Sequence, residues 1–141
     1  MTGLGCNCGM DALKNPLLAR LCSDHDKILE LSKRLAVAAG KATPADRLAA
    51  LQAAGALRQL LRDHHKLEET QFLPWIARLD WPVEAQELVV EHRAGEDLMD
   101  AIVVALRQGN ASAAGQGAAR LDQALCAHIA HEGTIFKKLD A

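Results

Sequence analysis

Four long segments of the chain carry apolar residues at helical spacing, and each begins at a helix-start signal. Each start offers a capping side chain, and three place a proline at or near the first helical position. The starts are Asn15-Pro16, Thr43-Pro44, Asp80-Trp81-Pro82 and the stretch from Asn110 to Ser112. We expect ends near Ala39, Gln108 and Leu139, and a kink or an end at Pro74. Because the connections are short, the predicted fold class is all-α, an up-down-up-down antiparallel four-helix bundle.

The length and composition agree with one helical domain. A chain of 141 residues can bury a core without disulfides. Ala and Leu supply most of the 50% apolar residues, and aromatic residues make up only 3%, a balance that favours helix over strand. The start of the chain contains several glycines and shows little periodicity. We therefore expect a flexible N-terminal tail over residues 1–14 and the bundle over residues 15–141.

Charge and cysteine content limit the classes of function. The net charge of −2, without a long run of either sign, argues against a nucleic-acid or membrane partner. No apolar run approaches the roughly 20 residues that span a bilayer, and the first basic residue is Lys14, so we expect no secretory signal. These features predict a soluble, cytoplasmic protein. We accordingly interpret Cys6, Cys8, Cys22 and Cys126 as reduced thiols.

Histidines and glutamates interrupt the apolar stripes of all four predicted helices. An ionisable group at a core position is costly unless a partner compensates it. A lone buried histidine is usually hydrogen-bonded, but four helices that each place one inward are better explained by a metal centre. In three helices a glutamate follows four residues later, on the same face. The candidate ligands are His25, His64, Glu68, His92, Glu96, His128 and Glu132.

The depth of these histidines along the predicted bundle gives a second test. At a rise of about 1.5 Å per residue, His92 lies roughly 24 Å from the end of its helix and His128 roughly 26 Å from the start of the next, so the two agree. His25 and His64 differ by about 9 Å around the first connection. This mismatch indicates that the second helix overhangs the first or begins irregularly.

The sequence also contains a weak internal repeat. His64-x-x-x-Glu68-x-Thr70-x-Phe72 aligns with His128-x-x-x-Glu132-x-Thr134-x-Phe136. Two αα-hairpins related by a pseudo-twofold axis would bring one His-x-x-x-Glu motif from each half to the centre. That symmetry suits two metal ions bridged by two carboxylates.

These motifs resemble the hemerythrin-like, HHE cation-binding domain family over about residues 16–139. The most specific segment runs from His64-His65-Lys66-Leu67-Glu68-Glu69 through Thr70-Gln71-Phe72-Leu73-Pro74. The resemblance implies two non-haem iron ions with an oxo or hydroxo bridge, and zinc or manganese are the alternatives. It further implies bridging by Glu68 and Glu132, with terminal ligation by His25, His64, His92 and His128.

One position departs from the family pattern. Hemerythrins proper carry a fifth histidine one turn after the ligand of the third helix, and here that position is Glu96. Whether Glu96 is a seventh ligand stays open; if it binds, its charge should favour ferric iron and weaken reversible oxygen carriage. His65 and His131 lie off the ligand stripe, and we expect Glu69 to be exposed or to act behind the direct ligands.

The ligand set predicts a protein that binds, senses or responds to O₂, peroxide or nitric oxide. Two alternatives stay open. The first is an enzyme, an oxidoreductase of the peroxidase or oxidase type that draws electrons from Cys22 or from the thiols of Cys6 and Cys8. The second is a module that stores or handles iron. The sequence does not indicate the oligomeric state.

Overall fold

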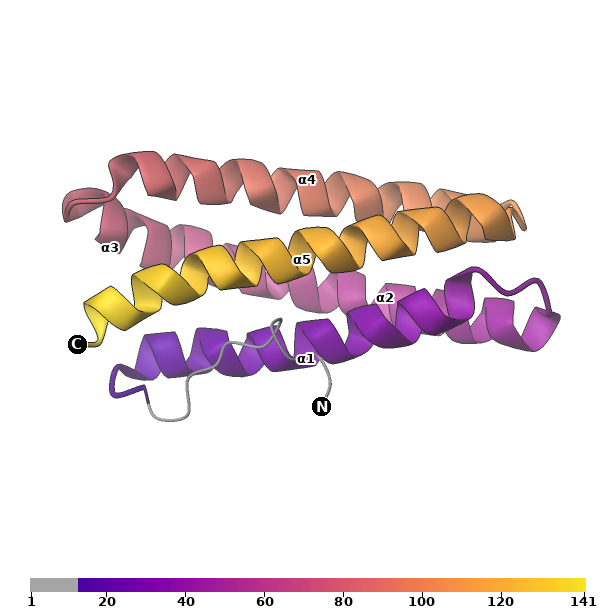
Figure 1. Ribbon diagram of the computed structural model, residues 1–141, viewed down its shortest axis with the longest axis horizontal. Coiled ribbons are helices and arrows are strands. Elements are labelled where there is room, and N and C mark those ends of the chain that lie inside the picture. The colour runs from indigo at the N-terminus through magenta and orange to yellow at the C-terminus, as the bar shows by residue number, and fades with distance from the viewer. Residues whose placement is uncertain (1–12) are drawn as a thin grey trace.

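The computed structural model describes residues 13–141, and over this range it contains helices and no strands (Figure 1). The four long helices are α1 (Pro16–Ala39), α2 (Pro44–Leu67), α4 (Pro82–Arg107) and α5 (Ala111–Leu139). Between α2 and α4 lie a π-helical turn, η1 (Glu68–Phe72), and a short helix, α3 (Leu73–Arg78). None of the helices in this part of the chain is long and apolar enough to cross a membrane. The predicted all-α four-helix bundle is confirmed.

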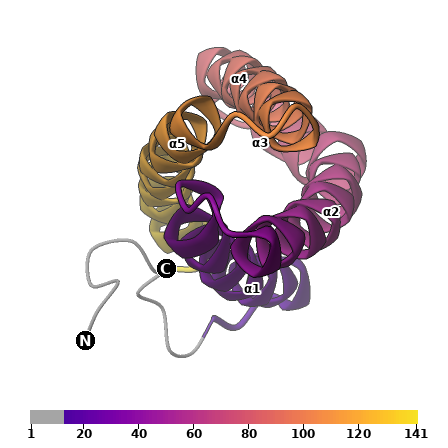
Figure 2. The ribbon, with the colours of Figure 1, turned by 90° about the vertical axis from the view of Figure 1, so that its right-hand side faces the viewer.

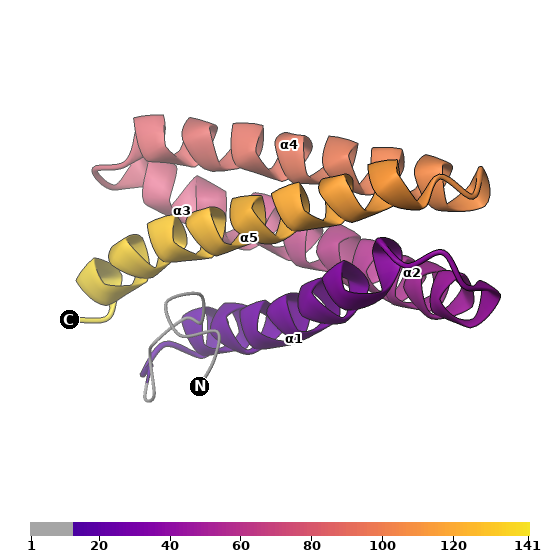
Figure 3. The same cartoon turned by 45° about the vertical axis from the view of Figure 1, so that its right-hand side comes forward.

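The long helices run alternately up and down (Figure 1) and surround a common axis (Figure 2). α1 packs beside α2 and α5, and α4 packs beside the same two helices. The short helix α3 leads the chain from the end of α2 back to the start of α4 (Figure 3). The start of α1 and the end of α5 meet where the Asp140 carboxylate accepts hydrogen bonds from the backbone N–H groups of Lys14 and Asn15, both at 2.9 Å. All four long helices therefore face one interior.

The helix starts follow the capping signals in the sequence. The side chains of Asn15, Thr43 and Asn110 each accept a hydrogen bond from a backbone N–H group in the first turn of the helix that follows. Such a cap satisfies an amide group that has no partner within the helix and contributes about 1 kcal/mol. α4 begins at Pro82 without a side-chain cap. The predicted starts of α1, α2, α4 and α5 are confirmed.

The kink or end predicted at Pro74 takes the form of a π-helical turn just before the proline. Pro74 lies in the first turn of α3, where a missing N–H is tolerated. The preceding residues, Glu68–Phe72, form the wider π-helical turn, and both Glu68 and Phe72 are buried in it. Such turns occur frequently at functional sites. This one carries a candidate metal ligand.

Two apolar clusters fill the interior. We call the first the Ala/Leu core; it lies toward the α1–α2 connection and includes Leu35, Ala50, Ala54, Leu57, Met99, Ala118 and Leu121. We call the second the Phe core; it lies toward α3 and includes Leu18, Leu21, Phe72, Ile76, Leu88 and Phe136. Along each long helix, the candidate ligands fall between the residues of these two cores. The candidate site is therefore a polar layer inside an apolar bundle.

At the α1–α2 connection, α2 extends past the end of α1 (Figure 1). This overhang explains why His25 and His64 appeared to lie at different depths. At the same end α5 comes very close to the connection, because a Cβ atom added at Gly115 would lie 2.8 Å from the Cα of Gly40. A glycine at position 115 thus permits close packing that a larger residue would prevent.

The cysteines differ from the prediction. Cys22 and Cys126 each take part in a disulfide, so the expectation of reduced thiols is wrong for these two residues. Spacing in the sequence does not reveal such bonds, because the fold decides which sulfur atoms come within reach. As a disulfide, Cys22 is not the thiol reductant considered above. Cys6 and Cys8, with most of the predicted tail over residues 1–14, lie outside the described residues.

Candidate metal centre

Six of the seven candidate ligands converge in the layer between the two cores. They are His25 from α1, His64 from α2, Glu68 from η1, His92 from α4, and His128 and Glu132 from α5. Each is at most 7% exposed. They form two groups of four residues, and within each group the candidate ligand atoms lie within 4.8 Å of one another. Both groups contain Glu68 and Glu132, so we name them by their own histidines: the His25/His64 position and the His92/His128 position.

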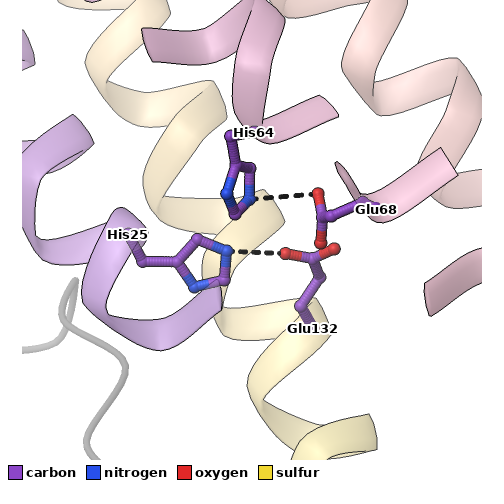
Figure 4. A group of neighbouring side chains, drawn as sticks. All are labelled: His25, His64, Glu68 and Glu132. Carbon is purple, nitrogen blue, oxygen red and sulfur yellow. Dashed lines mark ion pairs between the residues drawn. The ribbon is translucent and has the colours of Figure 1, made fainter. Parts of the chain in front are cut away.

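The two shared carboxylates lie between the two pairs of imidazole rings. In the first position, His25 Nε2 lies 2.8 Å from Glu132 Oε1 and His64 Nε2 lies 3.1 Å from Glu68 Oε1 (Figure 4). In the second, His92 Nε2 lies 2.9 Å from Glu68 Oε1 and His128 Nε2 lies 3.4 Å from Glu132 Oε1. Each carboxylate thus contacts one histidine of each position. This is the arrangement expected of a bridging ligand.

Most of these inward-facing atoms have no correctly oriented hydrogen-bond partner among the described residues. They are Nε2 of His25, His64 and His128, Oε2 of Glu68, and both carboxylate oxygens of Glu132. Buried polar atoms in proteins are normally paired, and an unpaired one costs about 1–3 kcal/mol. Here the lone pairs face common points instead of hydrogen-bond donors. Imidazole nitrogen and carboxylate oxygen are suitable ligands for iron, manganese or zinc, so the donor set fits metal cations.

Three further carboxylates hold the outer nitrogens of the histidines. His64 Nδ1 donates to Asp24 at 3.2 Å, His92 Nδ1 to Glu69 at 2.9 Å, and His128 Nδ1 to Glu91 at 2.7 Å. A carboxylate in this place fixes the proton on Nδ1, turns the Nε2 lone pair to the metal and makes the imidazole a stronger ligand. His25 Nδ1 has no such partner among residues 13–141.

Sequence reasoning missed the roles of Asp24 and Glu91. Each directly precedes a candidate ligand, His25 or His92, and bonds a histidine of the adjacent helix. Consecutive residues of a helix point about 100° apart, so the neighbour of an inward ligand faces the next helix. An acidic residue beside a ligand was therefore the available signal. Glu69 follows the same rule: its side chain is 43% exposed, yet its carboxylate reaches a buried ring.

The structure does not bring Glu96 into either group. Its carboxylate accepts a hydrogen bond from His65 Nδ1 at 2.7 Å, and its side chain is 45% exposed. This hydrogen bond holds the Glu96 carboxylate at His65, which itself lies outside both groups, and not at the two shared carboxylates.

The two remaining histidines also lie outside both groups. The buried His65 ring stacks on the His92 ring, with centroids 3.9 Å apart and planes 11° apart. His131 is partly exposed, and its Nδ1 donates to the Glu91 carboxylate at 3.0 Å. Both therefore contact residues of the centre without facing the two shared carboxylates.

The groups of the layer perturb one another strongly. Burial lowers the pKa of His64, but the hydrogen bond to Asp24 and the close Glu68 carboxylate outweigh burial and raise it to about 9. Burial also lowers the pKa of His128, yet the neighbouring carboxylates, Glu132 first, raise it well above the usual value. Burial raises the pKa of Glu68, but its close contacts with Glu132 and with the surrounding histidines hold that pKa well below normal. Metal binding therefore has to displace protons from the imidazoles.

Buried histidines and glutamates from four antiparallel helices, arranged as two groups with shared carboxylates, define a helical cation-binding domain. The chain belongs to the hemerythrin HHE cation-binding domain family, whose model matches residues 17–139. No curated protein and no solved structure matched the chain.

Proposed function

We propose that this chain is a non-haem di-iron protein that binds and responds to a small ligand, namely O₂, peroxide or nitric oxide. The observation that carries the proposal is the sharing of Glu68 and Glu132 between two ligand groups, each with its own pair of histidines. One metal ion in a tetrahedral site needs only about four protein ligands. Six ligands that divide into two groups with two residues in common favour two ions.

The ligand types support iron. Ferritin-like di-iron bundles use Glu-x-x-His motifs and are richer in carboxylate, whereas this layer has four histidines and two glutamates. An iron ion with two imidazoles and two shared carboxylates would keep coordination positions for a small external ligand, and it would supply redox chemistry there.

The burial of the layer supports a small ligand rather than an organic substrate. The six residues are nearly inaccessible to solvent, and apolar cores lie on both sides of them. A diatomic molecule or peroxide can enter through modest side-chain motion, whereas a larger substrate would have to separate the helices. The chain itself orients the imidazoles through Asp24, Glu69 and Glu91 and excludes bulk water.

Reconstitution with Fe(II) tests the proposal. Metal-free protein is loaded without oxygen, its iron is counted, and absorption spectra are recorded after addition of O₂, hydrogen peroxide or nitric oxide in separate samples. We expect two iron ions per chain and a spectral change with at least one of the three ligands. Bound iron with unchanged spectra in all three samples would contradict ligand binding and would favour an iron-handling role.

A further inference from the structure

We propose that the two metal positions are unequal, and that the His92/His128 position takes up the first metal ion more tightly than the His25/His64 position takes up the second. The inference rests on the proposed function, because it requires two ions in the layer. It is carried by the surroundings of the four rings. These differ in hydrogen bonds, in charge and in the groups stacked on the imidazoles.

The hydrogen bonds to the outer nitrogens are unevenly distributed. At the His92/His128 position both rings donate to a carboxylate, at 2.9 and 2.7 Å. At the other position His64 makes the longest of the three bonds, at 3.2 Å, and His25 Nδ1 makes none within the described residues. Loss of such a partner typically lowers metal affinity by about 10–100-fold. One position is therefore fully oriented, and the other only half.

Charge favours the same position. Glu69 and Glu91 lie directly behind His92 and His128, and Glu96 lies behind His65, whose ring stacks on His92. Behind the other pair, Asp24 is the one carboxylate hydrogen-bonded to a ring within residues 13–141. A cation is stabilised by nearby negative charge even without direct ligation. The uneven charge and the uneven hydrogen bonds thus act in the same direction.

The internal repeat explains how the inequality arises. Glu69 follows the shared ligand Glu68, and the residue that follows the other shared ligand, Glu132, is Gly133. A glycine has no side chain to offer, so His25 receives no counterpart of the bond between Glu69 and His92. Its ring instead stacks on Phe136, with centroids 5.8 Å apart and planes 2° apart. The two halves of the chain therefore supply the same ligands and different supports.

The order of metal uptake tests the inference. Metal-free protein with ¹⁵N-labelled histidine is titrated with Zn²⁺ while the imidazole signals are followed by NMR, and Fe²⁺ binding is counted anaerobically in parallel. We expect the His92 and His128 signals to move during the first equivalent, and those of His25 and His64 during the second. Simultaneous movement of all four, or earlier movement of His25 and His64, would overturn the inequality and leave the metal centre intact. Absence of saturable binding of both ions would overturn the proposed function as well.

Substitution of Glu69 tests the cause. Glu69→Ala removes both the hydrogen bond and the charge behind His92, and it should lower the affinity of the first Zn²⁺ step by about 10–100-fold. Glu69→Gln keeps an acceptor oxygen, so the affinity of its first Zn²⁺ step should lie between that of Glu69→Ala and that of the wild type. Glu87→Ala removes a carboxylate from an exposed position of α4 and serves as the matched control, with unchanged affinity. An unchanged first step in Glu69→Ala protein of normal helical content would show that Glu69 does not position His92.

Discussion

The Ala/Leu core and the polar layer of candidate ligands lie in the same bundle and are similarly buried, but their chemistry is opposite. Residues such as Leu57 and Leu121 are fully enclosed and need no polar partner. Nearby along the same stripes, Glu68 and Glu132 are just as enclosed, and several of their oxygen atoms have no hydrogen bond within the described chain. The core gains free energy from burial alone, whereas the layer needs a compensating cation.

This difference means that apolar burial drives folding, whereas the polar layer depends on a bound cation. Burial of one leucine side chain contributes about 1.5–3 kcal/mol, and each orphaned polar atom costs about 1–3 kcal/mol. The two apolar cores can therefore bring the helices together before a metal ion arrives. When a metal ion binds, it pairs the buried polar atoms of the layer and removes their destabilising effect. A substitution in one region should therefore leave the property of the other region unchanged.

Removal of a shared carboxylate should have the largest effect on the layer. Glu68 contributes to both ligand groups, so Glu68→Ala should reduce bound iron at both positions to near zero. Its helical content should persist, because both apolar cores stay intact. Metal analysis after reconstitution and circular dichroism measure the two outcomes. Retention of two iron ions would show that Glu68 is not a ligand; the exposed Glu87→Ala variant is the control.

Truncation in the Ala/Leu core should give the reverse result. Leu57 is 0% exposed, and Leu57→Ala should lower the free energy of unfolding by about 2–5 kcal/mol, through lost burial and a residual cavity. Iron stoichiometry should stay at the wild-type value under conditions where the variant is folded. Chemical denaturation and metal analysis of one preparation compare the two regions directly. A large loss of iron from folded Leu57→Ala protein would mean that the regions are coupled.

The pH dependence should differ between metal-free and loaded protein. The pKa of His64 is raised from 6.5 to about 9, so its protonated ring stabilises the metal-free fold fully below pH 6.5. This contribution to stability is lost as the pH rises through 9. Burial, with the nearby His92 charge, lowers the pKa of His65 to about 4, so its contribution is present above 6.5 and is lost as the pH falls through 4. Stability of the metal-free protein should therefore be greatest near pH 6.5.

Loaded protein should behave differently above that pH, because metal ions and protons compete for the same imidazole nitrogens. Between about pH 6.5 and 9, the midpoint of thermal unfolding should fall for metal-free protein and rise or stay level for loaded protein. Thermal unfolding at several pH values, with and without a chelator, distinguishes the two. Parallel curves for both forms would contradict the assignment of His64 as a ligand.

Loss of a helix cap far from the layer should have the smallest effect. Thr43 caps α2 at the end next to the Ala/Leu core, where its side chain accepts a hydrogen bond from the Asp46 N–H. Thr43→Ala should lower the free energy of unfolding by about 1 kcal/mol. Its iron content should match that of the wild type, whereas Thr43→Ser, which keeps the hydroxyl group, should restore stability. An effect on iron content would again indicate coupling between the regions.

The helices and their order could be predicted from the sequence because their signals are local. Capping side chains, prolines and apolar spacing act within a few residues, and they located α1, α2, α4 and α5. The π-helical turn at Glu68–Phe72 could not be predicted in form, because such turns are rare and neither capping nor apolar spacing marks one in the sequence. The disulfides at Cys22 and Cys126 depend on spatial proximity, which spacing does not encode.

The candidate site, too, could be predicted from the sequence only in part. Six ligand candidates lie on inward stripes, and the structure gathers all six. Glu96, four residues after His92, was a possible seventh ligand, but its carboxylate bonds His65 and its side chain is partly exposed. The supports Asp24 and Glu91 act on the next helix, so their partners depend on packing that one sequence does not specify.

Iron stoichiometry of the wild-type chain tests the central claim most directly. Metal-free protein is reconstituted anaerobically with excess Fe(II), freed of unbound metal and analysed for iron and protein in the same sample. Two ligand groups with shared carboxylates predict two iron ions per chain. A stable value of one, or no retained iron, would contradict a dinuclear centre.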